Sequence, residues 1–507
     1  MLMALLTSLI LLALLIEYTF LPLRLQRAWT SPPRHRQELN EVKVLPHSGF
    51  IENTESRRSQ WSVAISGGGS RSFVASVGYF RALQKSGLSP AYISSVSGGS
   101  WFSAMYLHSG KTLGRSCGVG AQGHVVPSAI TSQELATANN SAFFIASNLY
   151  KEDLLRWDDM NRDDTWTLGI GRVFGSGDFA WDAGAADAPF WICNATANFA
   201  DGRVRTFEFT PLYAGITNVA HFALTDRAVL GTKICIQDKD RLLTTGAVAT
   251  ITDALGMSSA LHSFVIANKQ HLSSLLRMCL PHSTQKYVQK CVVLEKDGDR
   301  LLHNSVKVCD GGQLDNSGVL SLLKRGARRV LFLNNTNIPF KKWFREGENN
   351  LPSLFGATNP RTKYCSAPND IQVFSTSDYF NRIVPQLEDC ENRGDFLFAR
   401  ATLRVMPNHK HGVEGDYDVD FAVLTLCRAP NFVNRLPREV RAQIENEDFR
   451  LFDRHERALG KFPLYDTALE TPLGVSTLFL NQINLLSTYC EWAMDQHIAE
   501  LINDDDR

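Results

Sequence analysis

The chain has 507 residues, of which 44% are hydrophobic and 21% charged, and its 52 basic residues balance 52 acidic ones. This composition fits a globular protein with a sizeable core and excludes a disordered chain. The balanced charge gives no reason to expect nucleic acid as a partner. The ten cysteines form no CxxC pair and no Cys/His cluster at zinc spacing, so we expect no structural metal and no cofactor.

The chain begins with an apolar segment, "MLMALLTSLILLALLI", in which only Thr7 and Ser8 are polar. As a helix it would be roughly 24 Å long, just short of a bilayer core of about 30 Å. A cleaved signal peptide is the alternative, but the positive residue before the run and the small-x-small site after it are both missing. We therefore expect residues 1–23 to be a single N-terminal membrane anchor.

The side of the membrane on which the body lies is left open by the sequence. Positive residues after the apolar run favour the cytoplasm. Against this stand three glycosylation sequons, which would require the secretory lumen. The sequons are at Asn139, Asn194 and Asn334.

Residues 24–58 are rich in Pro, Arg, Gln and Glu, which is typical of a linker. From residue 61 onward, strand "WSVAIS", a glycine turn, helix "SFVASVGYFRALQKSG", strand "AYISSV" and helix "SWFSAMYLH" alternate. A second such unit, "SVKVC", "DGGQLDN", "SGVLSLLKRGA" and "RRVLFLN", begins at residue 305. This alternation predicts an α/β fold with a central, mostly parallel sheet.

Ser97 has the setting of a nucleophile in "ISSVSGGSW". Val96 ends a predicted strand, Gly98 and Gly99 follow, and a helix begins directly after them. Such a strand-to-helix turn presents the hydroxyl near the positive end of the helix, which favours its alkoxide. The alternative is a serine that caps an ordinary helix.

Three glycines at 67–69 directly follow the first strand of the predicted domain. Their backbone N–H groups can stabilise the oxyanion of acyl transfer, with roughly 3 to 4 kcal/mol per donor. A nucleotide loop would need a lysine, and a dinucleotide loop a third glycine where Ser72 stands. Arg71 follows the glycines and is a candidate for holding an anionic head group, or else for a surface salt bridge.

Asp310 is the candidate general base. It follows the predicted strand "VKVC" and precedes Gly311 and Gly312. The carboxyl ends of parallel strands point to the same edge of a sheet, so we expect the carboxylate to meet Ser97 there. The alternative is an ordinary aspartate in a turn before a helix.

Together, "SGGGSR", "SVSGGSW" and "DGGQLDNSGVLSLLKRGARRVLF" resemble the catalytic domain shared by cytosolic phospholipase A2 and fungal lysophospholipase (phospholipase B). "FEFTPLYAG" at 207–215 and "ALGMSSALHSF" at 254–264 are similar to inner segments of the fungal branch. The likeness implies one catalytic domain, residues 59–500, with a patatin-like three-layer sandwich and helical or loop insertions forming a cap or lid.

This family uses a Ser/Asp dyad without histidine. The resemblance implies Ser97 as nucleophile and Asp310 as general base. It implies an oxyanion hole formed by Gly68, Gly69 and Gly98, and a contact of Arg71 with the phosphate of the head group. It implies hydrolysis of fatty-acyl esters of phospholipids or lysophospholipids at a membrane surface. One departure is Ser95, where the family has glycine two residues before the nucleophile, and it predicts a more crowded turn.

Two other functions are kept open. A Ser-His-Asp esterase would take its base from His409 or His411 in "PNHKHGVEG". A catalytically inactive, membrane-anchored lipid-binding protein would need no base at all. The sequence leaves the oligomeric state, head group and acyl position undetermined.

Overall fold

The structure is a computed structural model, and it describes only part of the chain. The described residues are 39–41, 44–45, 54–108, 125–137, 188–199, 202–211, 213–216, 220–223, 233–238, 241–245, 251–259, 289–297, 300–343, 350–357, 370–445, 459–465 and 478–502.

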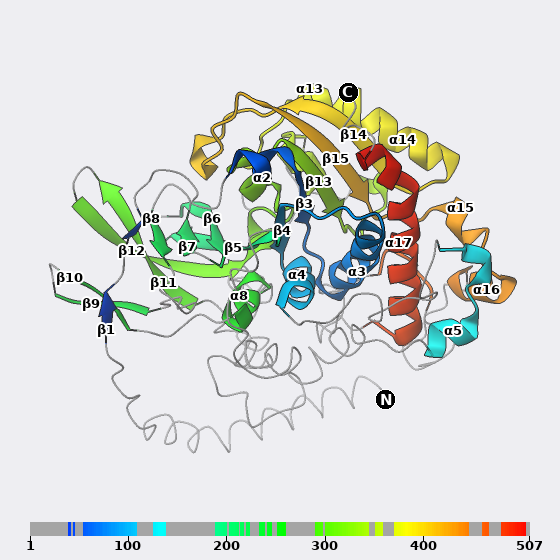
Figure 1. Cartoon of the computed structure of the whole chain (residues 1–507), viewed down its shortest axis with the longest axis horizontal. Helices are drawn as coiled ribbons and strands as arrows, with labels where there is room; N and C mark the ends of the chain where they lie inside the picture. The colour runs from blue at the N-terminus through cyan, green and yellow to red at the C-terminus, as the bar shows by residue number, and fades with distance from the viewer. Residues whose placement is uncertain are drawn as a thin grey trace, which may run out of the picture.

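The described strands form a large sheet and a small one (Figure 1). The small sheet has the order β1-β10-β9. The large sheet has 12 strands within the described residues, in the order β14-β15-β13-β3-β4-β5-β6-β7-β8-β2, with β12 on β5 and β11 on β12. The strands are β1 Leu39–Glu41, β2 Val44–Leu45, β3 Trp61–Ile65, β4 Tyr92–Val96, β5 Phe190–Phe199, β6 Val204–Phe209, β7 Tyr213–Ile216, β8 Ala220–Ala223, β9 Lys233–Asp238, β10 Arg241–Thr245, β11 Gln289–Asp297, β12 Arg300–Asp310, β13 Arg329–Asn334, β14 Leu397–Arg404 and β15 Asp418–Thr425.

The two longest described helices are α3, early in the chain, and α17, near its C-terminus. They are α2 Glu55–Ser59, α3 Gly69–Lys85, α4 Gly98–His108, α5 Ser132–Thr137, α8 Ile251–Ser258, α11 Val319–Leu323, α12 Leu351–Leu354, α13 Thr376–Asp378, α14 Val384–Arg393, α15 Pro430–Val433, α16 Arg438–Glu445 and α17 Leu480–Ile502. Short 3-10 turns lie at Pro127–Ala129, Gly311–Gln313, Phe340–Lys342 and His409–His411, and a π-helical turn at Tyr379–Ile383.

The centre of the large sheet is parallel: β15, β13, β3, β4 and β5 all run in one direction. Antiparallel strands flank this centre on both sides. Side chains alternate between the two faces of a strand. Ser95 hydrogen-bonds to Ser100 of α4, whereas Ser94 bonds to the carbonyl of Gly318 beside α11, so helices cover both faces. The predicted α/β class is confirmed, and the predicted parallel strands form the centre of the sheet.

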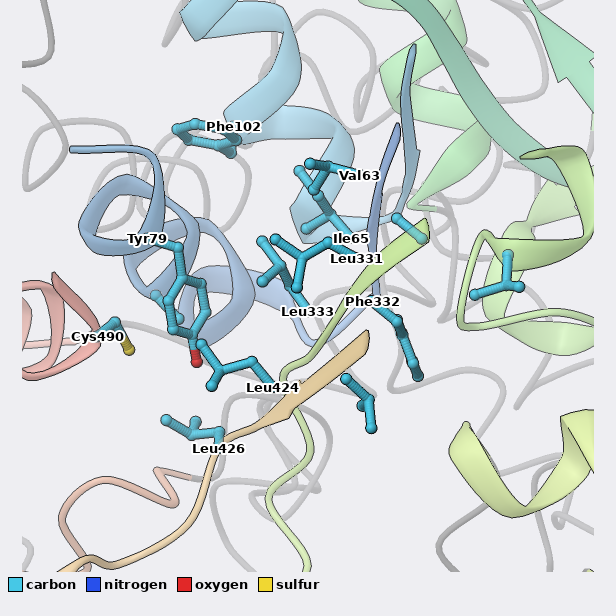
Figure 2. Close-up of a cluster of buried hydrophobic side chains, with 14 of the residues drawn as sticks. Val63, Ile65, Tyr79, Phe102, Leu331, Phe332, Leu333, Leu424, Leu426 and Cys490 are labelled. Atoms are coloured by element: carbon cyan, nitrogen blue, oxygen red, sulfur yellow. The ribbon is translucent and has the colours of Figure 1, made fainter. Parts of the chain in front are cut away.

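The core lies between the central strands and α3 (Figure 2). Val63, Ile65, Leu331 and Leu333 are at most 1% exposed and lie on the side of the sheet that faces α3, whereas Phe332 points to the other side. Each buried aliphatic side chain of this size contributes about 1.5 to 3 kcal/mol of hydrophobic stabilisation. The central strands read as nearly continuous apolar runs because both of their faces are buried.

The apolar segment predicted as a membrane anchor, residues 1–23, lies outside the described residues. Within the described ranges, we find no helix that combines the length and the apolar character needed to cross a bilayer. This finding overturns the predicted localisation at a membrane through one N-terminal anchor. The expected linker, residues 24–58, contains β1 and β2, which pair with β10 and β8.

Two of the three sequons are buried. Asn194 is 2% exposed and donates to Ser94, and Asn334 is fully buried and accepts from Asn350. The folded protein therefore presents neither side chain to a glycosylating enzyme. Asn139 lies outside the described residues.

Helices α3 and α17 lie side by side and cross at a glycine (Figure 1). A Cβ on Gly78 would lie 2.0 Å from the carbonyl oxygen of Ser487 and 2.9 Å from the Cβ of Cys490. The buried carboxylate of Glu491 ties the helices together through an ion pair with Arg81, whose Nε lies 3.1 Å from Oε2, and by accepting a hydrogen bond from Lys85. The backbones can approach this closely only because residue 78 has no side chain.

Gly78→Ala should therefore lower the free energy of unfolding by about 2 to 3 kcal/mol, because the methyl group must push the α17 backbone away. Urea denaturation followed by circular dichroism measures the loss. Glu388→Ala, at an exposed position of helix α14, is the control and should change stability by less than about 0.5 kcal/mol. Equal stability of Gly78→Ala and wild type would contradict the close crossing.

Candidate active site

Ser97 occupies a sharp turn between β4 and α4. Its φ of 51° is left-handed, a conformation that costs a residue with a side chain about 1 to 2 kcal/mol. Its carbonyl accepts from the N–H groups of Ser100 and Trp101, over 2.9 and 3.3 Å, which begins the helix. The side chain is 9% exposed. The structure thus forms the strand-to-helix turn predicted for this serine, even with Ser95 in place of glycine.

Asp310 is the last residue of β12 and lies beside Ser97. The Oγ of Ser97 donates to Oδ2 of Asp310 over 3.2 Å, and the N–H of Gly312 donates to Oδ1 over 2.7 Å. Burial of the carboxylate, which is 2% exposed, raises the pKa of Asp310 to about 7, although both hydrogen bonds lower it. The raised pKa brings the carboxylate closer in basicity to the hydroxyl from which it would take a proton.

The two residues meet for a topological reason that differs from the prediction. We expected both to end parallel strands, but β12 runs antiparallel to β5. β5 is ten residues long and extends beyond the end of β4, which pairs with it only as far as Asn194. β12 occupies the remainder of the same edge of β5 and ends opposite Ala195. The carboxyl ends of β4 and β12 therefore meet head to head.

The glycine loop lies against the serine turn. A Cβ on Gly98 would lie 2.0 Å from the carbonyl oxygen of Gly69, and one on Gly67 would lie 3.2 Å from the Cβ of Ser97. The N–H of Gly67 donates to the carbonyl of Asn316 over 3.1 Å. For Gly69 and Gly98, no acceptor for the N–H is found within the described residues. Gly69 and Gly98 thus lie next to the serine turn, and the role of Gly68, Gly69 and Gly98 as oxyanion donors stays a prediction.

Arg71 does not lie on the surface. It is 4% exposed, and its guanidinium donates to the carbonyls of Asn335 and Tyr465 over 3.1 and 2.6 Å. A Cβ on Gly68 would lie 2.9 Å from the Nη2 atom of Arg71, so the charge of this guanidinium is fixed beside the glycine loop. The arrangement excludes the alternative of a surface salt bridge.

Two residues near the serine were missed by the sequence analysis. The Oγ of Ser258, in α8, accepts from the N–H of Ser97 over 3.0 Å and donates to the carbonyl of Asn194 over 2.6 Å. The available signal was the segment at 254–264, which resembles the fungal branch but suggested no role for a particular side chain. Asn194 was noted only as a sequon.

The histidines considered for a triad form no hydrogen bond with the dyad in the described part of the chain. His411 is 2% exposed, and its ring nitrogens have no hydrogen-bond partner among the residues that the structure describes. Burial, followed by the charges of Lys324 and Arg205, lowers the pKa of His411 to about 3. Metal-binding clusters of three or more His, Cys, Asp or Glu residues are also absent from the described ranges.

Asp310→Asn should stabilise the protein above neutral pH. The pKa of Asp310 is raised from about 3.9 in the unfolded chain to about 7 in the folded one. Between these values the folded state keeps a proton that the unfolded state has released, so stability falls as pH rises through about 7. Asparagine cannot ionise, and its amide can still bond to Ser97 and Gly312. Thermal unfolding should show a higher Tm than wild type above this pH and a vanishing difference in acid. The exposed Asp418→Asn is the control, and an equal gain there would contradict the assignment.

Comparisons with protein-family profiles and with curated proteins find no match. Among solved structures, the chain is similar to human GIVD cytosolic phospholipase A2, with 12% identity and a TM-score of 0.46. The alignment covers 88% of this chain and 62% of the other, so this chain spans less than two thirds of that protein's length. The same human enzyme in complex with methyl gamma-linolenyl fluorophosphonate and terbium chloride gives 12% identity, a TM-score of 0.39, and coverage of 88% and 59%.

Proposed function

We propose that the protein is a lipid acyl hydrolase that cleaves fatty-acyl esters of phospholipids or lysophospholipids. The observation that carries the proposal is the hydrogen bond from Ser97 to Asp310, at a left-handed turn beside a glycine loop. The sequence resemblance supplies the substrate class. The proposed catalytic domain is residues 59–500, and the membrane surface is proposed only as the place where substrate is found.

In the proposed reaction, the Oγ of Ser97 attacks the ester carbonyl while its proton passes to Oδ2 of Asp310. N–H groups of Gly68, Gly69 and Gly98 hold the oxyanion of the tetrahedral intermediate. The ester C–O bond then breaks, and the leaving alkoxide takes the proton back from Asp310. Water attacks the acyl-enzyme, gives its proton to Asp310, and releases fatty acid as Ser97 regains its proton.

Arg71 has an electrostatic role in this proposal. Its buried guanidinium beside Gly68 adds a fixed positive charge to the site, and in a medium of low dielectric such a charge stabilises nearby anions strongly. We propose that it favours both the oxyanion and the phosphate head group. No cofactor takes part in the proposed reaction.

Ser97→Ala and Asp310→Asn should each reduce fatty-acid release from diacyl and lyso phospholipids by about 1,000-fold or more, because nucleophile and base act as a unit. A fluorophosphonate probe should label wild type and not Ser97→Ala.

Alanine at both His409 and His411 tests the triad. The dyad predicts that this double variant is still labelled by the probe. Near-normal turnover by Asp310→Asn would refute the dyad. A wild-type protein that binds phospholipid vesicles but is never labelled would indicate an inactive lipid-binding protein.

The pH dependence offers an independent test. Asp310 must be ionised to accept the proton, and its pKa is about 7, raised by burial. With a soluble p-nitrophenyl ester, kcat/KM should therefore rise with pH along an acid limb whose midpoint is at about 7. A midpoint near the ordinary aspartate value of about 3.9 would contradict a general base whose pKa is raised by burial.

A further inference from the structure

The left-handed turn at Ser97 must be held by its surroundings, because a strained backbone persists only where neighbouring contacts fix it. The carbonyl of Ser97 is held from within its own helix, by Ser100 and Trp101. Its N–H is held from outside, by the hydroxyl of Ser258 over 3.0 Å. Helix α8, which carries Ser258, lies against α4 and β5 (Figure 1).

Resting on the function proposed above, we propose that Ser258 is a positioning residue for the Ser97 nucleophile. It does not touch the reacting atoms. It supplies the acceptor that keeps the Ser97 amide, and with it the left-handed φ, in the orientation from which Oγ reaches Asp310.

The hydroxyl of Ser258 is itself oriented by a buried chain of hydrogen bonds. The indole N–H of Trp191 donates to Ser95 over 2.9 Å, and Ser95 donates to Ser100 over 3.2 Å. The hydroxyls of Ser100 and Ser258 are 3.2 Å apart, and Ser258 donates to the carbonyl of Asn194 over 2.6 Å. All five residues are at most 2% exposed.

The direction of this chain follows from counting protons. A hydroxyl has one proton and two lone pairs. Ser258 commits its proton to Asn194, so Ser100 is the donor between the two serines and Ser258 accepts from both Ser100 and Ser97. The proton of Ser258 is thereby directed to Asn194, which leaves a lone pair of its oxygen for the Ser97 amide. Ser95, which stands where the resembling family has glycine, is one link of this chain.

The assignment is tested by comparing Ser258→Ala, Ser258→Thr and Ser259→Ala with wild type. Ser259 directly follows helix α8, and its hydroxyl donates to the carbonyl of Leu255 in that helix over 2.6 Å, so it is the matched control. For each protein, kcat and KM for fatty-acid release, the rate of fluorophosphonate labelling and the Tm are measured.

Ser258→Ala should lower kcat and the labelling rate by about 10- to 100-fold, the range expected for a small displacement of the nucleophile. KM should stay within about twofold, because no substrate contact is removed. Ser258→Thr keeps the hydroxyl and should recover most of the rate, and Ser259→Ala should match wild type. If Ser258→Ala does not unfold cooperatively, Ser258→Cys replaces it. The cysteine thiol is a weaker acceptor than the serine hydroxyl, so this variant should lose less of kcat and of the labelling rate than is expected for Ser258→Ala.

If folded Ser258→Ala, or Ser258→Cys, had the same kcat and labelling rate as wild type, the positioning role would be overturned. A loss in Ser258→Thr equal to that in Ser258→Ala at unchanged Tm would also overturn it, because the hydroxyl would then be irrelevant. A wild-type protein that neither releases fatty acid nor reacts with the probe would refute the proposed function itself, and the positioning role with it.

Discussion

The site depends on the length of one strand. β5 offers one edge to two partners in succession, β4 as far as Asn194 and β12 from Ala195 onward. Because these partners run in opposite directions, their carboxyl ends meet and place a serine and an aspartate in contact. Gly311 makes this meeting possible, since a Cβ there would lie 2.6 Å from the carbonyl of Asn194.

Burial at this meeting point has opposite effects on stability and on reactivity. Removing Asp310 from water disfavours its charged form, which destabilises the fold at and above neutral pH. The same burial makes the carboxylate a stronger base. Glu208, also buried, shows the contrasting case: burial raises its pKa, but Arg325 and Lys324 outweigh this and lower it overall. A paired carboxylate stays ionised and supports the structure, whereas the unpaired one at residue 310 can exchange a proton.

The sequence predicted the features that arise from local pattern. Strand and helix periodicity around Ser97, and glycines where the backbone turns sharply, were sufficient to predict the strand-to-helix turn that carries this serine. The direction of β12 was not predictable, because it depends on which distant strand accepts it. The hydrogen bond from Ser97 to Ser258 joins residues 161 positions apart. A single hydroxyl that accepts from a single amide produces no repeating pattern in the sequence. For Arg71 the sequence left a head-group contact and a surface salt bridge open, because the carbonyls that enclose its guanidinium come from two remote segments.

The positions of Ser97 and Asp310 along the chain indicate when during folding the two residues meet. Ser97 and Asp310 are separated by 213 positions, and the strand that brings them together lies between them in the sequence. Contacts of such long range form late in folding, because closing a large loop costs entropy before any contact compensates for it. A nascent chain that has emerged only through β5 has a serine turn and no base. The proposed dyad is therefore complete only after β12 has emerged and docked, and an incompletely synthesised chain would lack the proposed general base.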